Sequence, residues 1–209
     1  MRIAILGTGR LARALGAHWR DVGHEVRHGA ATPARPAPAE ADTLPLAVAA
    51  AGADIIVLAL PWAGVPAALA ACGDLAGRVL IDATNPLVMG PNGLELAVGP
   101  DTSGGEQVQA LVPGAQVFKA LNHMGAAFMA RATAGGRRPV TTVAGPETPA
   151  LARVLGLIAD LGFDARHGGE LAMARLLEPQ AMVWIRLAFS GRDPEEADCP
   201  FRGRTTAPA

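Results

Sequence analysis

Short runs of aliphatic residues alternate along the chain with longer, alanine-rich segments in which apolar residues recur at helical spacing. Short continuous apolar runs are typical of strands buried on both faces, and the longer periodic segments predict helices. We expect strands at residues 2–6, 25–28, 54–60, 78–82, 116–120, 140–144 and 163–167. We expect helices at residues 9–22, 44–51, 62–72, 106–112, 148–161 and 171–189, the last one broken at Pro179. This alternation predicts an α/β fold with a doubly wound, mostly parallel sheet and helices on both faces.

The chain divides into one domain and a tail. Residues 1–190 carry all the expected strands and helices, including a short C-terminal extension, and are long enough to form a single core. Residues 30–42 contain three prolines, so we expect a loop there. Residues 191–209 are polar, and we predict a weakly ordered arm, or one ordered by a partner subunit.

A glycine pattern joins the first expected strand to the first expected helix. It reads Gly7-Thr8-Gly9-Arg10-Leu11-Ala12. In a dinucleotide-binding turn, the first small residue permits the tight turn, the second lets the backbone approach a pyrophosphate, and the third allows close packing of helix on strand. The helix adds free N–H groups and the positive end of its dipole. We therefore predict a Rossmann-type dinucleotide site formed by these six residues; the alternative is a purely structural glycine turn.

The end of the second expected strand bears on the choice between NAD and NADP. Enzymes that use NAD usually carry Asp or Glu there, about 20 residues after the glycines. This chain has Ala30 and Ala31, and Glu25 lies too early, at the start of the strand. Arg35 in the following loop is able to pair with a 2′-phosphate, and Arg10 lies close to the phosphates. We expect NADPH to be favoured over NADH; alternatively, Arg35 is a solvated loop charge.

Three further strand ends should border the same cofactor, because ligands of open α/β sheets bind at the carboxyl ends of the strands. The residues there are Leu60, Pro61 and Trp62, then Asn85 and Pro86, and finally Ala120 and Asn122. Asn85 carries an amide able to bond a ribose hydroxyl or a nicotinamide carboxamide, or it forms only an Asx-Pro turn. His123 is a candidate proton donor to a carbonyl or imine, although a lone loop histidine more often has no such role. Asn85 and His123 are thus the candidate catalytic residues.

Composition narrows the class of protein. The 209 residues carry 18 basic and 19 acidic side chains, a formal net charge of -1, so no positive surface argues for nucleic acid or an anionic membrane. The apolar stretches are too short, or too interrupted by Pro, Gly and Asp, to span a bilayer. Two cysteines cannot build a disulfide framework, and the dispersed histidines predict no metal site. We expect a cytoplasmic globular protein.

Several segments resemble the coenzyme F420-dependent NADP oxidoreductase family, small Rossmann proteins that pass hydride between NADPH and a deazaflavin. The segments are Ile5 to Gly9, Ala53 to Trp62, Val79 to Leu87, Val117 to Asn122 and Leu177 to Ala181. The one that contains Asp82, Asn85 and Pro86 is the most specific, and the resemblance extends over about residues 2–189. It implies an NADPH-dependent F420 reductase that takes F420 or a flavin as co-substrate and forms a homodimer.

Two departures from the family pattern bear on substrates. The family usually has Gly-Ser-Arg after the second strand, where serine and arginine hold the 2′-phosphate of NADP; this chain reads Gly29-Ala30-Ala31. A basic residue a few positions later corresponds to Arg35. The family often has Phe-Asn-Thr in the loop that faces the acceptor, where this chain reads Leu121-Asn122-His123. The resemblance therefore implies hydride transfer and leaves the small-molecule acceptor open.

Hydride transfer needs little acid–base machinery, which agrees with a chain that shows no obvious catalytic constellation. Our leading hypothesis is an NADP(H)-dependent oxidoreductase with a deazaflavin or flavin-like acceptor. A reductase of small imines or ketones is one alternative, although the residues after Phe163 leave little room for the helical domain that builds the pocket of such enzymes. A non-catalytic dinucleotide-binding sensor is the other.

Overall fold

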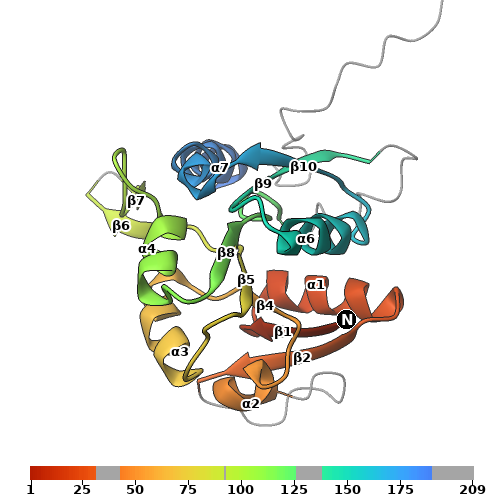
Figure 1. The fold of residues 1–209 in the computed structure, drawn as a ribbon. Coiled ribbons are helices and arrows are strands. Elements are labelled where there is room, and N and C mark those ends of the chain that lie inside the picture. Colours follow the sequence, from red (N-terminus) through yellow and green to blue (C-terminus); the bar gives the residue numbers. More distant parts are fainter. Residues whose placement is uncertain (32–42, 92, 126–137, 190–209) are drawn as a thin grey trace, which may run out of the picture.

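The computed structural model describes residues 1–31, 43–91, 93–125 and 138–189. Within these ranges the chain forms an eight-stranded sheet, a two-stranded hairpin and a set of helices that cover the sheet (Figure 1). The strands of the sheet are β1 (Arg2–Leu6), β2 (Glu25–Ala30), β3 (Thr43–Pro45), β4 (Ile55–Leu58), β5 (Val79–Asp82), β8 (Gln116–Lys119), β9 (Val140–Ala144) and β10 (Asp164–Gly169). The hairpin consists of β6 (Leu87–Gly90) and β7 (Gly93–Leu96). The helices are α1 (Arg10–Asp21), α2 (Leu46–Ala50), α3 (Val65–Ala71), α4 (Gly104–Leu111), α6 (Pro149–Ala159) and α7 (Ala174–Phe189), with short 3₁₀ turns η1 (Trp62–Gly64) and η2 (Leu171–Met173).

Strand β1 lies inside the sheet, and the chain winds away from it in both directions. The strand order is β10-β9-β8-β5-β4-β1-β2-β3. Every neighbouring pair from β3 to β8 is parallel, whereas β9 joins β8 in the antiparallel sense and β10 runs parallel to β9. The predicted doubly wound, mostly parallel sheet is confirmed. The winding reverses between β1 and β4, and ligands of such sheets bind at the carboxyl ends of the strands at this switch point.

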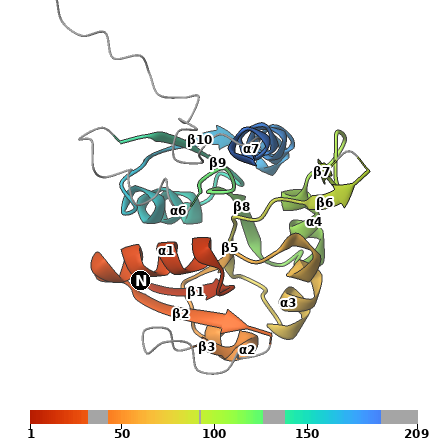
Figure 2. The ribbon, with the colours of Figure 1, turned by 180° about the vertical axis from the view of Figure 1, so that it is seen from behind.

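Helices lie on opposite faces of the sheet (Figure 1), and each face has its own cluster of buried apolar side chains. On one face, Leu15 of α1 and Leu157 of α6 pack in the same cluster as Ile5 of β1. On the other face, Leu69 of α3 packs in the same cluster as Leu6 of β1. Neighbouring residues of β1 thus face opposite layers, as the alternation of a strand requires. Figure 2 shows from behind that α1 and α6 lie on one side of β1, and α2 on the other.

The structure corrects several predicted elements. Helix α7 runs through Pro179, so the predicted break there is wrong. The proline removes only the N–H that would bond the carbonyl of Arg175, and the residues just before it, Leu177 and Glu178, are fastened to the rest of the chain by contacts described below. The hairpin β6–β7 and the three-residue strand β3 were not predicted, because neither contains a long apolar run. The predicted tail at 191–209, and most of the predicted loop at 30–42, lie outside the described residues.

Candidate functional site

The turn between β1 and α1 is enclosed by the two neighbouring strand ends. The amide of Gly7 donates to the carbonyl oxygen of Gly29, near the end of β2, over 2.8 Å. Gly7 has a φ of 136°, and a Cβ there would collide with the carbonyl oxygen of Ala59, which follows β4. Only glycine combines this conformation with so close an approach. The tight-turn role expected of Gly7 therefore has a steric cause.

The first turn of α1 presents an open surface. Its N-cap residue is Gly9, no side chain caps the helix, and the first turn holds no acidic residue. A Cβ on Gly9 would meet no atom within 4 Å. Ala12 is fully buried against the sheet, and Thr8 and Leu11 are half-buried. Free N–H groups, a positive dipole end and room above Gly9 suit a phosphate, so these residues fit the pyrophosphate of a dinucleotide.

His28 supports this turn from the end of β2. Its side chain is buried, and Nδ1 lies 3.2 Å from the carbonyl oxygen of Gly7. Burial lowers the pKa of the imidazole; the bond to Gly7 partly offsets this, and the charges of Arg20 and Arg13 lower the pKa further. The ring is therefore neutral at pH 7, and we assign its proton to Nδ1 because Gly7 offers an acceptor there.

The described residues that directly follow His28, Gly29 to Ala31, offer no polar side chain to a ligand. Ala30 is half-buried and Ala31 is exposed, and the predicted Arg35 lies outside the described residues. Sequence reasoning missed Arg13, which is exposed on α1 and whose Nε donates to the carbonyl oxygen of Thr8 over 2.9 Å. Its position three residues after Arg10, on the same helix face, was the available signal.

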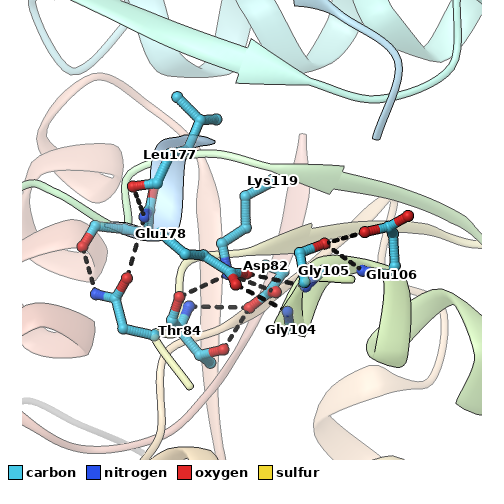
Figure 3. A network of polar contacts seen from close by, with 11 residues as sticks. Asp82, Thr84, Gly104, Gly105, Glu106, Lys119, Leu177 and Glu178 are labelled. Carbon is cyan, nitrogen blue, oxygen red and sulfur yellow. Dashed lines mark hydrogen bonds and ion pairs between the residues drawn. The ribbon is translucent and has the colours of Figure 1, made fainter. Parts of the chain in front are cut away.

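A network of buried charges lies at the neighbouring strand ends, where Lys119 of β8 points toward Asp82 of β5 and Glu178 of α7 (Figure 3). The Lys119 Nζ lies 2.9 Å from Oδ2 of Asp82 and 2.7 Å from Oε1 of Glu178. It also donates to the carbonyl oxygen of Thr84 over 2.7 Å. The side chains of Lys119 and Asp82 are 0% exposed and that of Glu178 is 2% exposed. All three donors of the ammonium group are therefore used inside the protein.

The two carboxylates of the network also accept hydrogen bonds from neighbouring segments. Oδ1 of Asp82 accepts from the amide and the hydroxyl of Thr84, over 2.9 and 2.7 Å. Glu178 accepts from the amides of Gly104 and Gly105, over 2.8 and 3.0 Å, and so caps the start of α4 (Figure 3). Buried charges persist only when their partners are this complete. The network fastens β5, β8, α4 and α7 to one another.

No pattern of spacing in the sequence pairs Lys119 with Asp82 and Glu178, but one compositional signal exists. Lys119 is the only lysine among the 18 basic residues of the chain. Lysine carries a compact point charge with three donors, whereas the arginine guanidinium is a planar fork. A chain that otherwise uses arginine has a lysine where an ammonium group meets three oxygens.

Asn85 and Asn122 bridge the ends of β5 and β8. Nδ2 of Asn85 donates to the carbonyl oxygen of Asn122 over 2.6 Å, and Nδ2 of Asn122 donates to Oδ1 of Asn85 over 3.1 Å and to the carbonyl oxygen of Leu177 over 3.0 Å. Leu121, just before Asn122, has a φ of 64°, a conformation that costs a non-glycine residue about 1 kcal/mol or more. Oδ1 of Asn122 is buried without a hydrogen-bond partner. The bridge fixes the separation of two strand ends that were both predicted to border the cofactor.

His123 follows the end of β8 and is half-buried. Its Nε2 lies 3.4 Å from the hydroxyl of Thr141, and its Nδ1 is buried without a partner. Burial lowers the pKa of His123 to about 4, so the ring is neutral at pH 7. A neutral imidazole is a weak acid, which disfavours the predicted role of proton donor.

The other predicted residues form a wall beside the network. A Cβ on Gly104 would lie 3.2 Å from the indole of Trp62 and 3.3 Å from the ring of Pro86, so both rings pack at the start of α4. Leu60 is half-buried and Ala120 is fully buried, while Pro61 is exposed. The structure therefore brings the glycine turn and the ends of β4, β5 and β8 to the same edge of the sheet, and does not describe Arg35.

Among residues 1–31, 43–91, 93–125 and 138–189, no group of three or more His, Cys, Asp or Glu is placed to hold a metal ion. No helix in the same ranges is both long enough and apolar enough to cross a bilayer. One hollow of the described surface is lined by residues that include Leu96, Glu178 and Pro179 and none of the glycine turn.

Comparisons with known proteins were made by family and by structure. The family model of coenzyme F420-dependent NADP oxidoreductases matches residues 2–86. A candidate F420-dependent NADP reductase from Arthrobacter sp. FB24 is 36% identical, with a TM-score of 0.82 over 90% of this chain and 93% of that one. The protein SMa0349 from Sinorhizobium meliloti, described as hypothetical, is 27% identical, with a TM-score of 0.71 over 82% of this chain and 86% of that one.

More distant structures share the fold. A reductive aminase from Aspergillus terreus, solved with NADPH and ethyl levulinate, is 22% identical with a TM-score of 0.68. The alignment covers 91% of this chain but 62% of the aminase. No functionally curated protein matches the chain.

Proposed function

The chain belongs to the family of coenzyme F420-dependent NADP oxidoreductases, and on this premise we propose that it transfers hydride between NADP(H) and a deazaflavin or flavin-like acceptor. The observation that carries the proposal is the turn from Gly7 to Ala12, an uncapped and open helix start at the switch point of the sheet. Such a start binds the phosphates of a dinucleotide.

The residues of the site bind and orient the reactants. The turn holds the pyrophosphate, and Ala30 and Ala31 line the adenine ribose. The remaining wall consists of Leu60, Pro61, Trp62, Asn85, Pro86, Ala120 and Asn122. The Asn85–Asn122 bridge and the buried network keep this wall at a fixed distance from the turn, because a small displacement of reacting rings costs much of the rate.

Reduction of a deazaflavin or flavin-like acceptor needs little acid or base catalysis from side chains. When bound, NADPH supplies a hydride, with both electrons of the reduction, and the acceptor takes it up together with a proton from water. Because His123 is neutral at pH 7, a reaction that needs no side-chain acid agrees better with the site than reduction of a carbonyl or imine.

The proposal is tested by NADPH oxidation, followed as absorbance loss by the purified protein. Coenzyme F420 and FMN serve as parallel acceptors, and NADH is the donor control. We expect turnover with NADPH and one of these acceptors, and F420 alone would identify the family reaction. Tight NADPH binding without oxidation by either would contradict hydride transfer to a deazaflavin or flavin and leave an imine or ketone reductase or a sensor.

We also propose that the protein is a cytoplasmic homodimer, as the family resemblance and composition predict. Exposed apolar side chains support a second copy as the partner: Leu176 and Val183 are 64% and 60% exposed. They lie seven residues apart on one face of α7. Light scattering after gel filtration should give twice the chain mass, and Val183→Glu should lower it toward the monomer value; a monomeric wild-type protein would contradict the dimer.

A further inference from the structure

The first turn of α1 carries charges that the helix itself disfavours. Arg10 is the first residue of the helix and Arg13 the fourth, and the first turn contains no acidic residue. Cations near a helix N-terminus oppose its dipole, and two cations three residues apart repel each other. Within the described residues, neither guanidinium group has a carboxylate partner. An anionic ligand would offset both contributions, because it is attracted to the two guanidinium groups and to the N-terminus of the helix.

The position of Arg13 is fixed by a backbone contact. Its Nε donates to the carbonyl oxygen of Thr8 over 2.9 Å, which holds the guanidinium group beside the glycine turn. Its charge also lowers the pKa of His28 of β2, whose ring lies against the carbonyl oxygen of Gly7. Arg13 therefore lies beside the glycine turn, on the side where β2 contacts it. The adenine ribose of a dinucleotide is bound between these two segments.

The residues directly after His28 carry no side chain that distinguishes NADP(H) from NAD(H), so another residue must do so. Neither a carboxylate for a ribose 2′-hydroxyl nor a serine or arginine for a 2′-phosphate directly follows His28, since the next three residues are Gly29, Ala30 and Ala31. Arg13 is an exposed cation beside the glycine turn, and within the described residues its Nη donors have no hydrogen-bond partner.

We propose that Arg13 binds the 2′-phosphate of NADP(H) and sets the preference for NADP(H) over NAD(H). The inference rests on the proposed function and deepens it by naming the residue that reads the coenzyme. A guanidinium group binds phosphate through two parallel N–H donors, and the contact from Nε to Thr8 leaves the Nη donors for this purpose. Recognition is thereby carried by α1 instead of the end of β2.

Arg10 provides a matched control. It carries the same charge on the same helix, one turn earlier, where the free N–H groups face the pyrophosphate. NAD and NADP share the pyrophosphate, so Arg10 should act on both coenzymes equally. The roles of Arg10 and Arg13 are therefore distinguished by whether a substitution weakens binding of both coenzymes or of NADPH alone.

The test is a set of dissociation constants for NADPH and NADH, measured by nicotinamide fluorescence at low ionic strength. The proteins are the wild type, Arg13→Gln, Arg13→Lys, Arg10→Gln and Arg35→Gln, with thermal melts to verify folding. We expect Arg13→Gln to weaken NADPH binding by about 10- to 100-fold, as loss of a charge-assisted contact does, and NADH binding less than about twofold. Arg13→Lys keeps the charge and should fall in between, while Arg10→Gln should weaken both coenzymes alike.

The other outcomes overturn the inference. Equal weakening of both coenzymes by Arg13→Gln would assign Arg13 to the pyrophosphate. No effect of Arg13→Gln, together with selective loss of NADPH in Arg35→Gln, would assign the 2′-phosphate to Arg35. A wild-type protein that binds neither coenzyme would contradict the proposed function itself, a result distinct from both.

Discussion

The two halves of the sheet's carboxyl edge are built in opposite ways. At the turn that follows β1 the polar groups are the free backbone N–H groups of α1 and two exposed arginines that have few protein partners. At β5 and β8 the charged groups of Asp82, Lys119 and Glu178 are buried and complete one another. The difference separates two tasks. The first region keeps its polar groups available for a ligand, and the second uses them to hold secondary structure in place.

The largest effect should follow from removing the cation of the buried network. Lys119→Met leaves the carboxylates of Asp82 and Glu178 buried without their partner, and this should cost about 3–5 kcal/mol of unfolding free energy. Urea denaturation measures the loss. The control is Arg175→Gln, which breaks the ion pair with Glu106, where the side chains are 40% and 24% exposed. That change should cost less than about 1 kcal/mol of unfolding free energy. Equal losses in the two variants would contradict the distinction between the buried network and the partly exposed ion pair.

The two glycines of the turn should respond differently to the same added methyl group. Gly7→Ala forces a Cβ against Ala59 at a φ of 136° and should cost about 1–3 kcal/mol of stability as well as coenzyme binding. Gly9→Ala meets no protein atom, so stability should change by less than about 0.5 kcal/mol. It should still weaken NADPH binding by about tenfold or more, because the methyl group occupies the approach of the phosphates. Unchanged binding in Gly9→Ala would place the pyrophosphate elsewhere.

Stability should fall on mild acidification because of the histidines. Burial lowers the pKa of His28, and lowers that of His123 from 6.5 to about 4. Between the folded and unfolded pKa values the unfolded chain binds more protons, so unfolding free energy decreases as the pH falls below about 6.5. The carboxylates with lowered pKa, Asp54, Glu106 and Asp164, contribute only below about pH 5. Between pH 7 and 5, the unfolding free energy, measured by denaturation, should fall less steeply with decreasing pH in His123→Gln than in the wild type. Equal slopes of unfolding free energy against pH would contradict the burial of a neutral ring.

The smallest effect should be that of His123→Ala on turnover. If the acceptor takes its proton from water, the rate of NADPH oxidation at pH 7 should change less than about twofold, well below the 100-fold or more expected for loss of a general acid. NADPH binding is measured alongside. A loss of turnover with intact binding would favour a carbonyl or imine acceptor and a catalytic imidazole.

Much of the fold could be predicted because its signals are local. The apolar run at β4 and the glycine pattern after β1 each identify an element from consecutive residues. The hairpin β6–β7 could not be predicted this way, because its four-residue strands are only partly buried. The path of α7 through Pro179 depends on what Leu177 and Glu178 contact, and those contacts come from β8 and α4.

The residues of the candidate site show the same difference between local signals and contacts of distant residues. Gly7, Gly9 and Ala12 form a pattern of nearly consecutive residues, so the sequence alone indicates the turn that contains them. Glu178 lies 74 residues from Gly104 in the chain, and no periodicity links the two. The neutral state of His123 depends on burial by its surroundings, which a loop sequence does not reveal.

The burial of the only lysine has a practical consequence for chemical labelling. Reagents that acylate amines require an accessible nitrogen, and the side chain of Lys119 is fully buried and paired with Asp82 and Glu178. The folded chain should therefore react at its α-amino group alone. A second adduct, seen by intact mass spectrometry, would report that α7 has separated from the sheet, so the native sequence already contains a single-site probe of local opening.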